Sequence, residues 1–189
     1  MPGDSTVTAP PRGTRPRNRR ALIIAAATDL FHRFGYDQVG MSDVASAVNV
    51  GSSALYRHFA SKPKLLTAAV VAEMDPFREV FSRAASGTLE DLAHGMAEVA
   101  AQGSRLGALW QREARSLPAE EYPLLRAEIV HTLDALSRPI RARRPELSAE
   151  DAHLLAQCAC SALISVSHRG GDLPRPDVER LLREITLTV

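Results

Sequence analysis

The sequence predicts an all-α protein of about nine helices, with a small N-terminal three-helix unit followed by a larger helical domain. Apolar residues recur at steps of three and four over most of the chain, which is the period of a helix face. Hydrophobic residues make up 45% of the chain but aromatic residues only 5%. Because runs of β-branched and aromatic residues are typical of strands and are scarce here, the composition favours helices.

The N-terminal part divides into an arm and four predicted helices. Residues 1–16 contain four prolines and are predicted to be a disordered basic arm. From Arg17 an apolar face predicts the first helix, which ends where Gly35 supplies a left-handed cap. Short second and third helices are predicted over roughly 41–48 and 52–59. A long fourth helix begins near Ser61, and Pro76 predicts a kink or break in it.

Capping signals locate two of the four or five helices that follow. Thr88 with Asp91, and Ser148 with Asp151, have the three-residue spacing of a capping box. Such a box satisfies backbone N–H groups that lack a partner within the helix, so each pair predicts a helix start.

The remaining predicted helices are a short one over about 105–116, an amphipathic one over about 122–140, and a last one that begins near Pro176. The apolar residues of the last helix fall on one face: Val178, Leu181, Leu182 and Ile185.

Charge is spread unevenly along the chain, although the net charge is only +1. Residues 1–64 carry nine Lys or Arg against four Asp or Glu, and the remainder carries fourteen against eighteen. A basic N-terminal third favours a polyanion as the partner of that end. The alternative interpretation is a chance fluctuation in composition.

Several classes of protein lack their signatures here. No stretch has the roughly 18 to 20 apolar residues of a membrane span, and no apolar segment of a secretory signal lies near the N-terminus. Motifs for phosphate loops, nucleophile elbows and paired metal ligands are missing. We therefore expect a cytoplasmic, nucleoid-associated protein that is no enzyme, with no catalytic residue, metal or cofactor.

The chain's two cysteines, Cys158 and Cys160, lie two residues apart in a predicted helix. Side chains at that spacing point in different directions and do not readily form a disulfide. We interpret them as small core or interface residues in a reducing compartment, with redox sensing as the alternative.

Residues 40–59 have the arrangement of a helix-turn-helix. Asn49 tolerates the left-handed backbone of a tight turn, and Leu55 and Phe59 anchor the second helix from beneath. The second helix of such a pair lies in the major groove of DNA. Its accessible side would carry Ser52, Ser53, Ala54, Tyr56, Arg57 and His58. These side chains suit phosphates and base edges, so the motif predicts DNA binding; an ordinary helical hairpin is the alternative.

At these positions the sequence resembles the TetR family of repressors over about residues 17–70. The family's Leu-Tyr-x-His/Tyr-Phe segment corresponds to Leu55–Phe59, followed by Ser61-Lys62 and Leu65-Leu66. Upstream, Phe31, Phe34, Gly35 and Tyr36 are similar to the end of the family's first helix.

The resemblance implies a role for each matching residue. Tyr56, His58 and Lys62 would contact phosphates, and Ser52, Ser53 and Ala54 would face bases. The arginines Arg17, Arg19 and Arg20 would approach the backbone or the minor groove. Gly40 and Gly51 stand where the family usually has hydroxyl caps, so Ser42 and Ser52 are expected to substitute for the missing hydroxyls.

The resemblance also implies two regions with different functions. Residues 17–70 would form the DNA-binding domain, and residues 71–189 would bind an effector and dimerise. The candidate pocket residues are Phe77, Phe81, Met96, Leu106, Trp110, His131 and Leu133. Plain core packing is the alternative for each of them.

In this interpretation a homodimer binds double-stranded DNA at a palindromic operator, with half-sites roughly 34 Å apart, and a small apolar effector releases it. The last two helices, with small residues at 158–162, would form a four-helix dimer interface. The alternative is a DNA-binding regulator without a small-molecule effector, controlled by a protein partner or acting as an activator.

Overall fold

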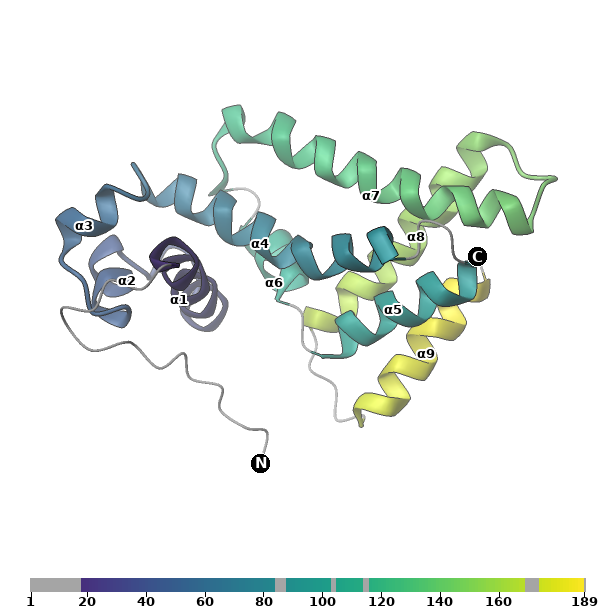
Figure 1. Ribbon diagram of the computed structural model, residues 1–189, viewed down its shortest axis with the longest axis horizontal. Helices are drawn as coiled ribbons and strands as arrows, with labels where there is room; N and C mark the ends of the chain where they lie inside the picture. The colour runs from purple at the N-terminus through teal and green to yellow at the C-terminus, as the bar shows by residue number, and fades with distance from the viewer. Residues whose placement is uncertain (1–17, 84–87, 103–104, 114–115, 169–173, 189) are drawn as a thin grey trace.

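The computed structural model describes residues 18–83, 88–102, 105–113, 116–168 and 174–188 (Figure 1). These residues form nine α-helices with a 3-10 helix, η2, before the seventh, and none of them lies in a strand. The all-α prediction is therefore confirmed. The predicted arm over 1–16, and Arg17, lie outside the described residues.

Three helices and the start of a long fourth helix form one end of the molecule (Figure 1). The bounds are α1 Arg19–Phe34, α2 Met41–Ala47, α3 Ser52–Tyr56 and α4 Lys62–Arg83. The other elements are α5 Leu89–Ala101, α6 Leu106–Glu113, η2 Ala119–Glu121, α7 Tyr122–Arg143, α8 Ala149–His168 and α9 Arg175–Thr188. Helix α4 leads from the first end into this second group, in which α5 packs against α9 and α7 against α8.

The turn between α2 and α3 has the geometry that the sequence predicts. Asn49 has a φ of 56°, the one positive φ of a non-glycine residue in the described part of the chain. The N–H of Val50 donates to the carbonyl of Ala45 at 2.9 Å, which closes the turn. Leu55 and Phe59 are buried beneath α3, so the anchoring of this helix is confirmed.

Helix ends follow the predicted caps. The N–H groups of Asp91 and Asp151 donate to the hydroxyls of Thr88 and Ser148, at 3.2 and 3.0 Å, so both predicted starts are confirmed. Gly35, with a φ of 85°, ends α1.

Helix α4 runs unbroken through Pro76, so a break there is a wrong prediction. Proline removes one backbone hydrogen bond and crowds the preceding turn. Here Met74, Phe77, Val80 and Phe81 are all buried in the same core. Burial on both sides of the proline offsets the lost bond and keeps the helix continuous.

The apolar face of α9 is only half buried. Leu182 is buried and Val178 partly buried, whereas Leu181 and Ile185 remain 38% and 45% exposed. Helix α5 packs against α9, and the described residues leave Leu181 and Ile185 partly open to solvent.

Substitutions at Asn49 test the left-handed turn. We expect Asn49→Gly to be more stable than Asn49→Ala by about 1 kcal/mol, because a Cβ disfavours positive φ. Both variants lose the amide group, so the difference isolates the backbone. Urea unfolding measures it, and equal stabilities would contradict a left-handed residue here.

Candidate functional site

Helix α3 presents a polar edge to solvent. Ser52, Ser53, Arg57 and His58 are exposed, Tyr56 is about half exposed and Ala54 is partly buried. The buried Leu55 fixes the rotation of the helix about its axis. The residues that the sequence assigns to the accessible side therefore lie on it, with Ala54 the least accessible.

An open hollow of about 540 Å³ lies where α2, α3 and the start of α4 meet. Its lining includes four of the predicted DNA contacts, Ser42, Ser52, Tyr56 and Lys62. The Nζ of Lys62 lies 4.1 Å from the centre of the Tyr36 ring. This cation–π contact orients the ammonium without neutralising its charge. No local sequence pattern indicates that Tyr36 contacts Lys62.

The start of α1 adds a further guanidinium to this end of the molecule. The Cζ of Arg20 lies 4.8 Å from the centre of the Phe59 ring. Arg20 is thus stacked on the residue that anchors α3. Arg19 is partly buried, and so is less accessible than the resemblance implies.

Helix α6 ties the large helical group to the end of α1. The Nη2 of Arg112 donates to the carbonyls of Phe31 and His32 at 2.6 and 2.9 Å. The buried Glu113 accepts from the N–H of Tyr36 at 3.2 Å and from the Nε of Arg112 at 2.6 Å. Carbonyls at a helix C-terminus lack intrahelical donors and carry partial negative charge, so a guanidinium there is stabilising.

The segment just before α6 is held as well. The Nη2 of Arg105 pairs with Asp29 of α1 at 3.1 Å, and its N–H donates to Glu73 of α4 at 2.8 Å. Burial raises the pKa of Glu73 above its ordinary value, against the opposing effect of that hydrogen bond. Residues at both ends of α6 therefore contact α1 or α4, which share a core with α3.

An apolar cavity of about 340 Å³ lies among α4, α5, α6, α7 and α8. Four predicted pocket residues line it: Phe77, Met96, Leu106 and Leu133. The others do not: Phe81 is buried in the core but outside the lining, and His131 is exposed on α7. The side chain of Trp110 lies outside the described part of the structure.

Helix α8 supplies cavity residues that the sequence analysis missed. They are Gln157, Cys160, Ser161, Leu163 and Ile164, and Met74, Ile129 and Thr132 from α4 and α7 join them. None of the lining residues that the structure describes carries a charge. The small residues at 158–162 were the available signal, but they also suited an interface.

The cysteines occupy different surroundings. Cys158 is exposed, whereas Cys160 lines the cavity, where burial raises the pKa of its thiol to about 12. A thiol that stays protonated is a poor nucleophile, so its surroundings favour a packing role.

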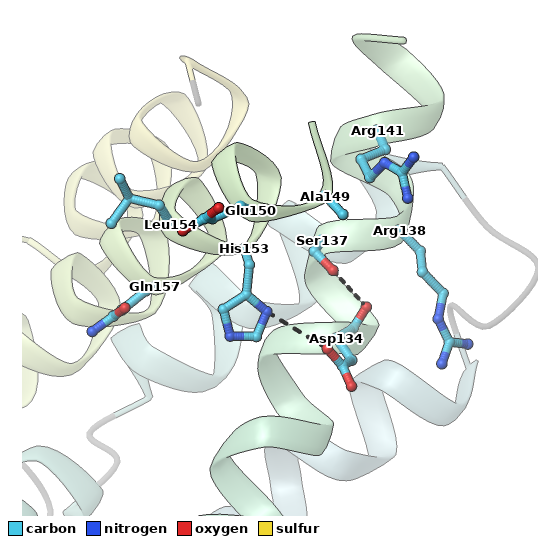
Figure 2. Close-up of a pocket in the computed structure, with 9 residues that line it drawn as sticks. All are labelled: Asp134, Ser137, Arg138, Arg141, Ala149, Glu150, His153, Leu154 and Gln157. Carbon is cyan, nitrogen blue, oxygen red and sulfur yellow. Dashed lines mark hydrogen bonds and ion pairs between the residues drawn. The ribbon is translucent and has the colours of Figure 1, made fainter. Parts of the chain in front are cut away.

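Another open hollow, of about 710 Å³, lies between α7 and α8 (Figure 2). The Nδ1 of His153 faces Asp134 at 3.5 Å across it, and the Ser137 hydroxyl donates to the Asp134 carbonyl at 3.0 Å. Figure 2 shows Arg138 pointing away from this pair, and Leu154 and Gln157 pointing to the other side of α8. The polar groups do not converge, so the arrangement links two helices and does not form a ligand site.

The described residues contain neither a metal site nor a membrane-spanning helix. No group of three or more His, Cys, Asp or Glu residues could hold a metal ion. None of the helices has a long enough apolar run to cross a bilayer.

Two short helices joined by a left-handed turn, with a polar outer edge and cations beside it, define the class of DNA-binding helix-turn-helix regulators. A sequence profile described as "Bacterial regulatory proteins, tetR family" matches residues 23–69. A transcriptional repressor of Mycobacteroides abscessus, "DNA-binding transcriptional repressor TetR", is 32% identical over 143 residues, covering 74% of this chain and 68% of that protein. The chain belongs to the TetR family of transcriptional regulators.

Solved structures share the fold over nearly the whole chain. A TetR-family regulator from Bordetella parapertussis has a TM-score of 0.75 at 19% identity, covering 91% of this chain and 95% of that one. AibR, solved in complex with isovaleryl coenzyme A and operator DNA, also has a TM-score of 0.75, at 20% identity, covering 88% and 97%.

Thiol labelling tests the surroundings of the two cysteines. At mildly alkaline pH we expect iodoacetamide to modify Cys160 on the order of a hundredfold more slowly than Cys158, because little of the buried thiol is ionised. Mass spectrometry of Cys158→Ser and Cys160→Ser isolates each rate. Equal rates in the folded protein would contradict a buried Cys160.

Proposed function

We propose that this chain is a dimeric, ligand-responsive repressor that a small apolar molecule releases from a palindromic operator. The observation that carries the proposal is the position of α6. Its first residue, Leu106, lines the apolar cavity, and its last two, Arg112 and Glu113, bond to the end of α1 and to Tyr36. One short helix thus extends from the cavity to the elements that face DNA in this proposal.

In the proposed complex the polar edge of α3 enters the major groove. Ser52, Ser53 and Ala54 face base edges, while Tyr56 and His58 lie beside the phosphate backbone. Arg57 is exposed next to them and contacts phosphates or bases. Residues 17–70 then act as the DNA-binding domain, and the remainder binds the effector and dimerises.

The phosphate contacts continue around this edge. Lys62 and Ser42 share the hollow beside Tyr56, and Arg19 and Arg20 extend the basic surface along the start of α1. Arg17 precedes the described residues and joins this set by its position in the sequence.

Dimerisation is proposed through α8 and α9. Leu154 of α8 is 59% exposed, and α9 adds the exposed Leu181 and Ile185. Exposed apolar residues on adjacent helices favour an interface between copies, and a two-fold axis would make the four helices self-complementary. A symmetric dimer reads a palindrome, since each subunit then meets the same half-site.

An uncharged effector fits the cavity best. The volume of about 340 Å³ is within the range of small-ligand sites, and the polar groups of its described lining are hydroxyl, thiol and amide groups. AibR, whose fold this chain shares, was solved with a ligand and operator DNA together, which supports a site for each on one such chain.

DNA binding tests the proposed interface. Selection from a random duplex pool should return a palindrome. Against that sequence we expect Tyr56→Phe and Lys62→Ala each to weaken binding by about fivefold to tenfold, since each loses a phosphate contact.

Lys62→Ala should also flatten the slope of log affinity against log salt by about 0.9. Fluorescence anisotropy measures both effects. Arg141→Ala, on the exposed surface near the far end of α7, is the control and should change neither. Unchanged binding by both Tyr56→Phe and Lys62→Ala would refute this interface.

Two probes of equal length test the chemistry of the cavity. Decanol should raise the unfolding temperature of the protein, whereas decanoate should raise it less, because no cation in the lining offsets burial of its carboxylate. Leu133→Trp, which fills the space, should abolish the effect of decanol. Calorimetry measures the shifts; stabilisation that persists in Leu133→Trp would place the ligand elsewhere.

A further inference from the structure

The start of α4 faces two hollows, one on each side of Tyr56. The first holds Lys62. The second, of about 620 Å³, is lined in part by Arg20, Arg57, His58 and Lys64, and Tyr56 lines both hollows. Positions 62 and 64 lie about 200° apart around a helix axis, so the chain's two lysines point to opposite sides of this tyrosine.

Lys64 is not free in this arrangement. Its Nζ lies 2.6 Å from the Oε1 of Glu121, in an ion pair that joins α4 to η2. The Lys64 side chain is 54% exposed, whereas that of Glu121 is only 13% exposed. The hydrogen bond to Glu121 raises the pKa of Lys64, which keeps the ammonium charged.

The backbone position of Glu121 is fixed by the 3-10 helix. Glu121 ends η2, its N–H donates to the carbonyl of Pro118 at 3.0 Å, and it directly precedes α7. The carboxylate is therefore the fixed partner of the pair, and the exposed lysine is the partner that can exchange. Asp75 is the other acidic residue of this hollow, three helical turns along α4 from Lys64.

We propose that Lys64 is a further contact to the DNA backbone, and that Glu121 competes with DNA phosphate for its ammonium. The inference rests on the proposed DNA interface, because Lys64 shares its hollow with Tyr56, Arg57 and His58. A half-exposed lysine pair is weak, and a phosphate contact gains from counterion release. DNA binding thus exchanges the carboxylate for a phosphate.

The competition has two consequences. Glu121 lowers affinity for every duplex, whatever its sequence, since phosphates carry no base information. It also links the interface to the cavity, because Glu121 precedes the helix whose Ile129 and Leu133 line the cavity.

Removal of the competing charge tests the proposal. The probe is a labelled mixed-sequence duplex long enough for a dimer, titrated by anisotropy over a series of salt concentrations. Glu121→Gln should bind it about twofold to fivefold more tightly, because Lys64 no longer has to leave a carboxylate. Lys64→Ala should bind more weakly and should flatten the salt slope by about 0.9, because one phosphate contact is lost.

Two controls distinguish the loss of the Lys64–Glu121 ion pair from a general change in the net charge of the protein. Glu120→Gln removes the same charge from the neighbouring exposed residue of η2, whose carboxylate acts on Lys64 only through its charge, and should have less than half the effect. In a Lys64→Ala background, Glu121→Gln should give no gain. Thermal unfolding verifies that each variant is folded.

The outcomes that overturn the inference are distinct from failure of the proposed function. Equal gains from Glu120→Gln and Glu121→Gln, or a gain that survives Lys64→Ala, show a general field effect and refute the exchange. An unchanged Glu121→Gln refutes it too. If Lys62→Ala and Tyr56→Phe also leave binding unchanged, the whole interface is misplaced.

Discussion

Helix α3 spans only five residues, and a helix that short is not stable in water by itself. It exists because Leu55 and Phe59 are buried in a core that also contains residues of α1, α2 and α4. That burial fixes which side chains face outward, and so it decides that Ser52, Ser53 and Tyr56 form an edge. The polar edge, the hollows beside it and the cations around them all depend on this anchoring.

Because the polar edge of α3 depends on this core, movements of helices that pack on the core would change the position of the edge. Helix α1 covers the core under α3, and its C-terminal carbonyls are held by Arg112 of α6. The buried Glu113 accepts a hydrogen bond from the backbone N–H of Tyr36. The ring of Tyr36 in turn contacts the ammonium of Lys62. Packed interiors transmit displacement because they have few voids. A shift of α6 would thus reach Lys62 through a chain of residues in contact.

Local signals located most of the fold, and their failures have physical causes. Capping pairs and the left-handed Asn49 concern neighbours in sequence, so the sequence contains the whole interaction. The break predicted at Pro76 does not occur, because local rules omit the burial of Phe77 and Val80 around it. The prediction that His131 lines the pocket was wrong, because helical periodicity does not say which individual side chains of a helix meet the core. The ion pair of Lys64 with Glu121 joins residues 57 apart, beyond any local pattern.

The sequence by itself determined the helical class, the position of the helix-turn-helix, the residues of its polar edge and the family resemblance, because each depends on spacings of a few residues. Only the tertiary structure decided how α6 and η2 contact the helices around the helix-turn-helix, which side chains of α8 line the cavity, and which apolar residues of α9 stay exposed. Those features depend on where distant helices meet, and that is set by how their side chains pack together.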